Sequence, residues 1–359
     1  MDRLQRLLNP RSIAVIGGGA WGEQLILQCQ KIGFAGDIWV VHPTKDAIAG
    51  LTPLRDLADI PRPPDAVFIG VNRHATIGIV RALTAIGTGG AVCFASGFSE
   101  AMSESADGND LQAALLDAAG EMPIIGPNCY GFLNYLDGVA LWPDQHGGVP
   151  VKSGVALIAQ SSNIAINLTM QARGLPLAYV VTVGNQAQTG FSEVGKALLA
   201  NPKVTALGLH IEGIDDLASF VDLAETARRL GKPIVALKVG QSSQAQVAAV
   251  SHTASLAGSD AGAQALFARL GIGRVTSLST FLETLKLLHV VGPLASASIA
   301  SMSCSGGEAS LMADAAHGTP VRFPALKPTQ TAVLRAKLGP LAALSNPLDY
   351  HTFIWGNED

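Results

Sequence analysis

A histidine in a loop of small residues is the strongest chemical signal in the sequence. His252 lies within residues 250–260, where serine, threonine, alanine and glycine leave an imidazole accessible. An imidazole nitrogen can carry a phosphoryl group when an acceptor holds the proton on the other nitrogen. Glu212 follows an expected strand and is the candidate acceptor. The pair is suited to a phosphohistidine site, although a loop histidine without a chemical role is the commoner case.

A glycine-rich turn near the amino terminus is the second signal. Residues 17–22 read Gly-Gly-Gly-Ala-Trp-Gly, and they follow an expected strand and open an expected helix. Such glycines let the backbone approach a phosphate, which the N–H groups and the helix dipole attract. Residues 40–43, at the end of the second expected strand, lack the acidic residue that binds a ribose of NAD. The turn favours a phosphate-bearing ligand other than NAD, and a turn that serves only packing is the alternative.

Further candidate binding residues also follow expected strands. Lys45 could pair with a phosphate as a point charge, although a lone surface lysine is the commoner case. The loops at residues 96–100 and 126–131 could bind a ligand or be ordinary turns. Ser161 and Ser162 precede a helix, so one could cap it while the other binds an anion. All of these lie where open α/β sheets bind ligands, at the carboxyl ends of strands.

The elements that position these residues repeat in the order strand, turn, helix. Hydrophobic residues make up 48% of the chain and charged residues only 14%, which favours an α/β fold with buried parallel sheets. We expect strands at residues 12–16, 38–41, 66–70, 91–95, 123–125, 155–159, 178–183, 206–211, 234–238, 274–275 and 298–302. We expect helices at residues 21–32, 74–86, 109–119, 164–173, 193–200, 216–230, 260–270, 280–291 and up to about residue 316.

The length of 359 residues predicts two or three domains. Residues 136–153 have no periodicity and are rich in glycine and proline, so we interpret them as a linker. The first domain would then span residues 1–135 and the second residues 154–293. Residues 294–359 would begin a further domain that the chain truncates, so we expect the chain to be a fragment.

Several functional classes are disfavoured by composition. The net charge of -4 gives no electrostatic case for binding nucleic acid. No apolar run reaches the roughly 18 residues of a membrane span, and the amino terminus lacks an apolar signal core. The four cysteines are scattered without a CxxC spacing, which predicts a reduced, cytoplasmic protein without a metal site.

The motifs in their order resemble the acetyl-CoA synthetase (ADP-forming) family, the NDP-forming acyl-CoA synthetases related to the succinyl-CoA synthetase α subunit. The resemblance covers essentially the whole chain, and residues 349–355 are similar to a feruloyl-CoA synthetase-like branch. Two departures are Val71 and Asn72, where relatives often have a proline, and Asn163, where a glycine often follows the serine pair. The motifs that carry the resemblance are residues 9–17, His42-Pro43 with Gly50, residues 96–98, 126–129, 251–253 and 346–349.

The resemblance implies a Rossmann-like CoA-binding domain followed by flavodoxin-like domains with parallel sheets. His252 would be the phosphate carrier and Glu212 its orienting carboxylate, with Ser161 and Ser162 at the helix that receives the phosphate. The implied CoA-binding residues are Gly17, Gly19, Ala20, Trp21, Gly22, Lys45, Val71, Ser96, Gly97, Phe98, Asn128 and Cys129.

The family reaction joins a carboxylic acid, CoA and ATP into acyl-CoA, ADP and phosphate. The resemblance implies that ATP or ADP and Mg²⁺ bind an ATP-grasp domain outside this chain, either on a partner subunit or on a further segment, and that the protein forms homo- or hetero-oligomers. Two other functions compete with this one. The first is an NAD-binding oxidoreductase, and the second is a non-catalytic, CoA-binding regulatory protein.

Overall fold

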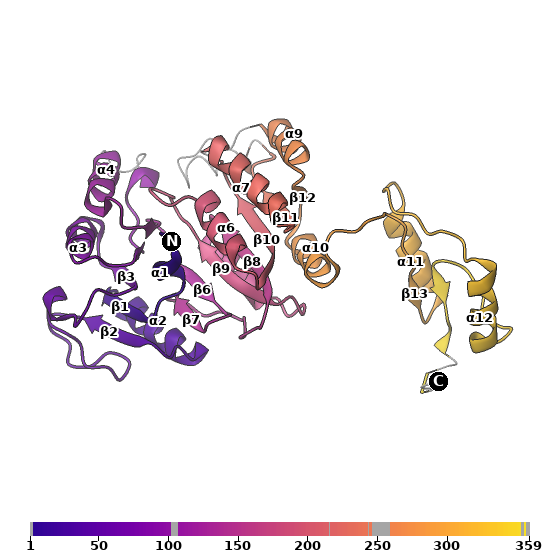
Figure 1. Ribbon diagram of the computed structural model, residues 1–359, viewed down its shortest axis with the longest axis horizontal. Coiled ribbons are helices and arrows are strands. Elements are labelled where there is room, and N and C mark those ends of the chain that lie inside the picture. Colours follow the sequence, from indigo (N-terminus) through magenta and orange to yellow (C-terminus); the bar gives the residue numbers. More distant parts are fainter. Residues whose placement is uncertain are drawn as a thin grey trace. The chain divides into compact units, whose positions relative to one another are not determined.

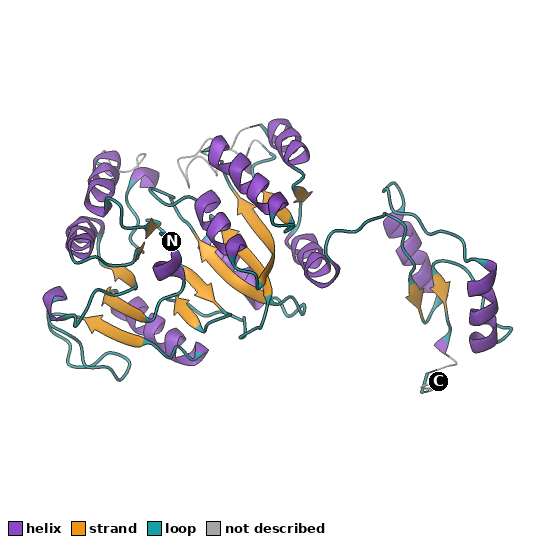
Figure 2. Ribbon diagram, in the orientation of Figure 1, coloured by secondary structure: helices purple, strands orange, loops and turns teal. Residues whose placement is uncertain are grey.

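The computed structural model divides the chain into two compact units, Met1–Gly292 and Pro293–Asp359 (Figure 1). The first unit contains two sheets with helices on their faces, and the second contains a short parallel pair of strands with two helices (Figure 2). The structure describes residues 3–101, 107–214, 216–242, 244–245, 259–352 and 355–356.

The first sheet has five parallel strands in the order β2-β1-β3-β4-β5. Strand residues alternate between its two faces, so Ile13 and Val15 join one hydrophobic cluster while Ala14 and Ile16 join another. The order reverses between β1 and β3, which opens a crevice at their carboxyl ends. The elements are α1 (Gln5–Leu8), β1 (Ser12–Gly17), α2 (Gly19–Ile32), β2 (Asp37–Val41), η1 (Leu57–Asp59), β3 (Ala66–Gly70), α3 (Arg73–Ala85), β4 (Ala91–Cys93), η2 (Ser99–Ala101), α4 (Gly108–Ala119) and β5 (Ile124–Ile125).

The second sheet has the order β12-β11-β10-β8-β9-β6-β7. Its strands β8 to β12 are parallel and repeat the order of the first sheet, with the reversal between β8 and β10. A second crevice is therefore expected at the ends of β8 and β10. The elements are β6 (Phe132–Asn134), β7 (Val139–Leu141), β8 (Gly154–Ala159), α5 (Ser162–Met170), β9 (Leu177–Thr182), α6 (Phe191–Ala200), β10 (Val204–Ile211), α7 (Leu217–Arg229), β11 (Ile234–Lys238), α9 (Asp260–Leu270), β12 (Gly273–Val275) and α10 (Leu278–Val291).

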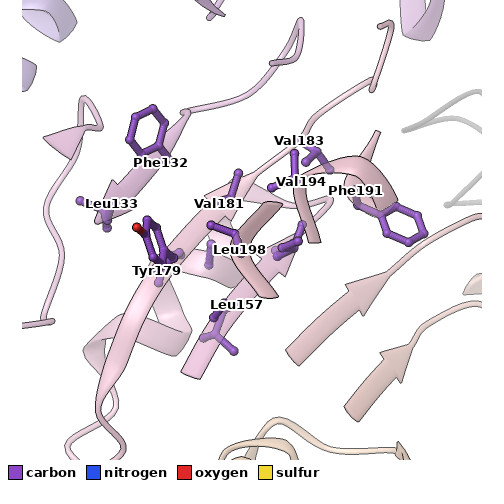
Figure 3. Close-up of a cluster of buried hydrophobic side chains, with 14 of the residues drawn as sticks. Phe132, Leu133, Leu157, Tyr179, Val181, Val183, Phe191, Val194 and Leu198 are labelled. Atoms are coloured by element: carbon purple, nitrogen blue, oxygen red, sulfur yellow. The ribbon is translucent and has the colours of Figure 1, made fainter. Parts of the chain in front are cut away.

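Helices cover both faces of the second sheet. A Cβ atom on Gly195 of α6 would lie 3.2 Å from Leu207, whereas one on Gly208 would lie 2.7 Å from Phe281 of α10. Because neighbouring strand residues point to opposite faces, α6 and α10 pack on opposite sides of β10. Figure 3 shows part of this core, including Leu157.

The hairpin formed by β6 and β7 corrects the predicted linker. In β6, Phe132 pairs antiparallel with Leu141 of β7 and with Val181 of β9. The Cys29 thiol of α2 contacts the Ala140 carbonyl at 2.8 Å, so the hairpin also packs on a helix of the first sheet. The prediction is wrong for residues 139–141, because three-residue strands are too short to show a two-residue alternation.

The second unit is built around a parallel pair of short strands. Its elements are β13 (Met302–Ser303), α11 (Gly306–Ala316), α12 (Pro328–Leu338) and β14 (Leu348–Asp349), and Met302 pairs with Leu348. The Asn346 amide donates to the carbonyls of Ile299 (2.9 Å) and Pro324 (3.0 Å), which ties the approach to β14 to the rest of the unit. The strand expected at residues 298–302 begins only at Met302.

Candidate active site between the two sheets

A cleft of about 630 Å³ lies where the carboxyl ends of strands from both sheets meet. Strands β3, β4 and β5 of the first sheet and β8, β9 and β10 of the second all end at it. The residues that follow these six strands and line the cleft include, in that order, Val71, Ser96, Asn128, Ser161, Asn185 and Glu212. The carboxyl ends of parallel strands from two sheets thus form one site, and five of these six loops carry residues predicted from sequence, the turn after β9 being the exception.

The glycine turn lies beside this cleft and requires its glycines. Gly17, Gly18 and Gly19 have φ angles of 66°, 86° and 53°, in the left-handed region. A Cβ atom on Gly17 would lie 2.6 Å from a methyl group of Val71, which itself lines the cleft. Helix α2 begins at Gly19, directly after the turn, so its first N–H groups are at the end of β1 next to the cleft.

Three aromatic side chains form a wall at the cleft. The ring of Trp21 lies 5.6 Å from that of Phe94 and 5.8 Å from that of Tyr130, and the last two rings are 5.8 Å apart. Phe94 and Tyr130 line the cleft, and Trp142 supports Tyr130 from the buried side at 5.5 Å. Burial, and then the carboxylate of Asp144, raises the pKa of the Tyr130 hydroxyl, which keeps it neutral.

The serine pair divides its tasks at the start of α5. The Ser161 hydroxyl accepts from the Ile164 N–H at 3.4 Å and caps the helix, as one of the two was expected to do. The Ser162 hydroxyl accepts from the Tyr130 N–H at 3.2 Å, which links α5 to the loop after β5. The anion that these residues were predicted to bind stays a prediction.

Glu212 follows β10 and is held by its neighbours. The side-chain oxygen of buried Gln160 accepts from the N–H groups of Glu212 and Gly213, and the Gln160 amide donates to the Gly213 carbonyl at 2.9 Å. Lys238, the last residue of β11, reaches the Glu212 carbonyl at 3.4 Å. His252, the predicted phosphate carrier, lies outside the described residues.

The loops after β4 and β5 are joined to the turn after β9. The Glu100 carboxylate accepts from the N–H groups of Gly97 (2.6 Å) and Phe98 (3.2 Å) and from the side-chain amide of Asn185. Asn128 donates to the Asn185 side chain at 3.4 Å. The Phe98 side chain is fully buried, so Phe98 could contact CoA only through its backbone.

Two residues that were predicted to bind CoA, Lys45 and Cys129, have different surroundings in the described structure. Lys45 is exposed and lies outside the lining of the cleft, and its carbonyl accepts from Arg55 at 2.7 Å. Cys129 is at the cleft wall, but burial raises the pKa of its thiol well above the ordinary value. The thiol is therefore neutral and packs against the Cys93 carbonyl.

Sequence reasoning missed Gln160 and Phe94, and it included Tyr130 only as a member of the loop at residues 126–131. Each is next to a residue or loop that was singled out, and the signal available was only its position after a strand. Within the residues that the structure describes, no cluster of histidine, cysteine or carboxylate side chains could hold a metal ion. Among the described helices, none is long and apolar enough to cross a membrane.

Two family models match successive parts of the chain. Residues 11–135 match a CoA binding domain. Residues 152–288 match the succinyl-CoA ligase like flavodoxin domain. The residues that line the cleft from Gly70 to Tyr130 fall in the first match and those from Gln160 to Glu212 in the second, although β6, at the end of the first match, is a strand of the second sheet.

Known proteins are similar over nearly the whole chain. A trans-feruloyl-CoA synthase of an unknown prokaryotic organism is 31% identical over 357 residues, covering 97% of this chain and 50% of the relative. The α subunit of acetate–CoA ligase (ADP-forming) II from Pyrococcus furiosus is 28% identical, covering 96% of this chain and 76% of the relative. The dinucleotide forming acetyl-coenzyme A synthetase 1 of Ca. Korarchaeum cryptofilum, solved with phosphate and ADP, has a TM-score of 0.86 at 25% identity, covering 98% of this chain and 76% of that one.

These matches confirm the predicted fold, a CoA-binding α/β domain followed by a flavodoxin-like domain of the succinyl-CoA ligase type. The chain spans about half the length of several curated relatives and about three quarters of others. The family resemblance seen in the sequence motifs is likewise confirmed. The chain belongs to the ADP-forming acetyl-CoA synthetase family, the NDP-forming acyl-CoA synthetases.

Proposed function

We propose that this chain supplies the CoA-binding and phosphohistidine parts of an enzyme that makes acyl-CoA, ADP and phosphate from a carboxylic acid, CoA and ATP. The observation that carries the proposal is the cleft that the two sheets share. A CoA-binding domain forms one side, and a succinyl-CoA ligase like domain forms the other. The thiol of CoA and a phosphorylated acid could therefore meet without crossing bulk solvent.

The proposed reaction proceeds in three displacement steps. His252 attacks the terminal phosphorus of ATP, and ADP leaves. A carboxylate oxygen of the acid attacks the phosphohistidine, which forms an acyl phosphate and releases the imidazole. The CoA thiolate then attacks the acyl carbon, and phosphate leaves. Two easier transfers through the histidine replace one difficult step.

The residues around the cleft have roles that fit this sequence. The Glu212 carboxylate accepts a hydrogen bond from the Nδ1–H group of His252, so that the other ring nitrogen is the nucleophile. The N–H groups at the start of α5, with Ser162, stabilise charge on the transferred phosphoryl group. The backbone N–H groups of the glycine turn before α2 bind phosphates of CoA, because glycines have no side chains that would block their approach. Among the predicted CoA contacts, Lys45 would act on a part of CoA outside the cleft.

The remaining parts of the enzyme follow from the same chemistry. We assign ATP and Mg²⁺ to an ATP-grasp domain on a partner subunit or a further segment, as the name subunit alpha of the Pyrococcus relative suggests. We assign residues 1–135 to CoA, residues 154–293 to the phosphohistidine, and residues 294–359 to a further flavodoxin-like domain. All four cysteines are free, which supports a cytoplasmic location.

The acid substrate is proposed to carry a flat aromatic or similarly apolar group. The wall of Trp21, Phe94 and Tyr130 offers ring faces and edges beside the Ser162 hydroxyl, near which the carboxylate would react. The trans-feruloyl-CoA synthase among the relatives is named for such an acid, whereas others are named for acetate and 4-hydroxybutyrate.

The test is a phosphate transfer that needs no nucleotide. Run backwards, an acyl-CoA and radiolabelled phosphate give the acyl phosphate and CoA, and the acyl phosphate then labels the histidine and releases the acid. We expect an acid-labile, alkali-stable label on the chain, and the same label from ATP once the ATP-grasp part is supplied. His252→Ala should abolish it, while His317→Ala, at an exposed histidine of the second unit, should retain it.

Equal labelling of His252→Ala and the unaltered chain would refute the phosphohistidine mechanism. Calorimetry tests the first domain separately, because CoA should bind more tightly than NAD. Tighter binding of NAD would return the first domain to the oxidoreductase alternative.

A further inference from the structure

We propose that Gln160 is the positioning residue for Glu212, a role that rests on the function proposed above for Glu212. Gln160 lies at the end of β8 and Glu212 at the end of β10, the two strands between which the sheet order reverses. The Gln160 side chain spans this reversal and fixes the main chain that carries the carboxylate.

The reversal leaves main-chain groups that a strand ladder cannot pair. The last ladder bond between the strands runs from the Gln160 N–H to the His210 carbonyl at 3.3 Å. Beyond it the chains separate, since α5 packs on β8 and β9 while α7 packs on α6. The N–H groups of Glu212 and Gly213 both donate to the Gln160 side-chain oxygen, with 3.0 Å for Gly213. The Gln160 amide completes the clamp on the Gly213 carbonyl at 2.9 Å.

Strand β11, the neighbour of β10 on the side away from β8, also holds Glu212. Lys238 of β11 donates to the carbonyls of Glu212 (3.4 Å) and Val239 (2.9 Å). Glu212 is thus held through its N–H from β8 and through its carbonyl from β11, and β10 lies between these strands. Both holding side chains are buried, Gln160 at 7% and Lys238 at 5% exposure. Water therefore competes little for their bonds.

Glutamine is the side chain that this clamp requires. One oxygen must accept two N–H bonds while a nitrogen on the same group donates to a carbonyl. A glutamate can accept both bonds but cannot donate while ionised, and a methionine of similar length can do neither. The clamp acts on the main chain that carries the Glu212 carboxylate, and small errors in such placement cost up to about 10²-fold in rate.

The experiment compares Gln160→Met with Gln160→Glu in the complete enzyme, with the ATP-grasp part present. We expect Gln160→Met to lower kcat by about 10- to 100-fold and to leave the KM for CoA and for the acid within about threefold. Gln160→Glu keeps the two accepted bonds and should recover part of the loss. The matched control is Gln188→Met, since Gln188 also accepts from a backbone N–H, that of Ile124 (2.9 Å), and donates to a backbone carbonyl, that of Gly120 (2.7 Å), away from the cleft. It should lose stability but keep kcat.

A double-mutant cycle distinguishes positioning from a general structural effect. If Gln160 acts through Glu212, then Gln160→Met should have little further effect in a Glu212→Gln background. If the kcat losses of the two single variants instead multiply in the double variant, the positioning role is overturned, whereas the proposed function stays intact. Normal histidine phosphorylation by Glu212→Gln alone would refute the role of Glu212 and, with it, the clamp. A loss of kcat in Gln188→Met equal to that in Gln160→Met would also count against the inference.

Discussion

Replacing single glycines by alanine separates the structural from the ligand-binding role of the turn before α2. Gly18 and Gly19 both have left-handed φ angles, 86° and 53°. A Cβ atom on Gly18 would lie 2.8 Å from the nitrogen of Gly22, whereas one on Gly19 meets nothing within 4 Å. Gly231, in the turn between α7 and β11, also has a left-handed φ of 66° and open space around it. It is the matched control.

The magnitudes follow from these surroundings. A left-handed φ costs a residue with a Cβ atom about 1–2 kcal/mol, and all three variants bear this cost. Only Gly18→Ala adds a clash with backbone atoms, which no rotamer change can relieve, and overpacking of this kind costs about 1–3 kcal/mol more. We therefore expect a loss of unfolding free energy of about 2–5 kcal/mol for Gly18→Ala and about 1–2 kcal/mol for the other two.

Denaturant unfolding and CoA calorimetry on the same preparations measure the two effects. Gly19→Ala should weaken CoA binding at least tenfold with only the small loss of stability, because its methyl group would occupy the space proposed for a CoA phosphate. Gly231→Ala should show the same small loss of stability with normal CoA binding. Unchanged affinity in Gly19→Ala would refute the approach of CoA phosphates to this turn. Equal stabilities of Gly18→Ala and Gly19→Ala would contradict the packing of the turn.

Two further predictions concern acid sensitivity and substrate choice. Burial lowers the pKa of His210 to about 4, so the unfolded chain takes up a proton below pH 6.5 that the folded chain does not. The free energy of unfolding should fall by up to about 3 kcal/mol between pH 6.5 and pH 4. In denaturant titrations at several pH values, His210→Leu should remove this part of the dependence of unfolding free energy on pH. An unchanged dependence in His210→Leu would contradict the buried neutral imidazole. Tyr130→Ala should raise the KM for aromatic acids at least tenfold and that for acetate little in a coupled synthetase assay, and equal effects on both acids would exclude the aromatic wall as the acyl site.

The strand and helix pattern was predictable where the elements are long and wholly buried. Strands such as Ala66–Gly70 and Ile234–Lys238 match the expected bounds, because a buried parallel strand is a run of apolar β-branched residues that ends in a glycine or polar turn. Helix α1 and the β6–β7 hairpin were not predicted. Their three or four residues give no periodicity, and they are stabilised by packing on elements that are distant in sequence.

The loops of the site were predictable, but the partnerships within them were not. Topology alone brings the ends of parallel strands to one edge, so Ser161, Asn128 and Glu212 could be expected at a ligand site. That the oxygen of Gln160 accepts two N–H groups about fifty residues away depends on which strands are neighbours. No local pattern carries that information.

Backbone hydrogen bonds, besides the side-chain bonds of Asn185 and Ser162, join the two halves of the site. The N–H of Asn185 donates to the Pro127 carbonyl at 2.9 Å, and that of Ala187 donates to the Gly126 carbonyl at 3.0 Å. The loop after β5 is thus bound to the turn after β9 in the way strands are bound in a ladder. Because such bonds do not depend on side-chain identity, we expect substitutions at the cleft to change the acid of the proposed reaction without moving the proposed CoA side away from the proposed phosphate side.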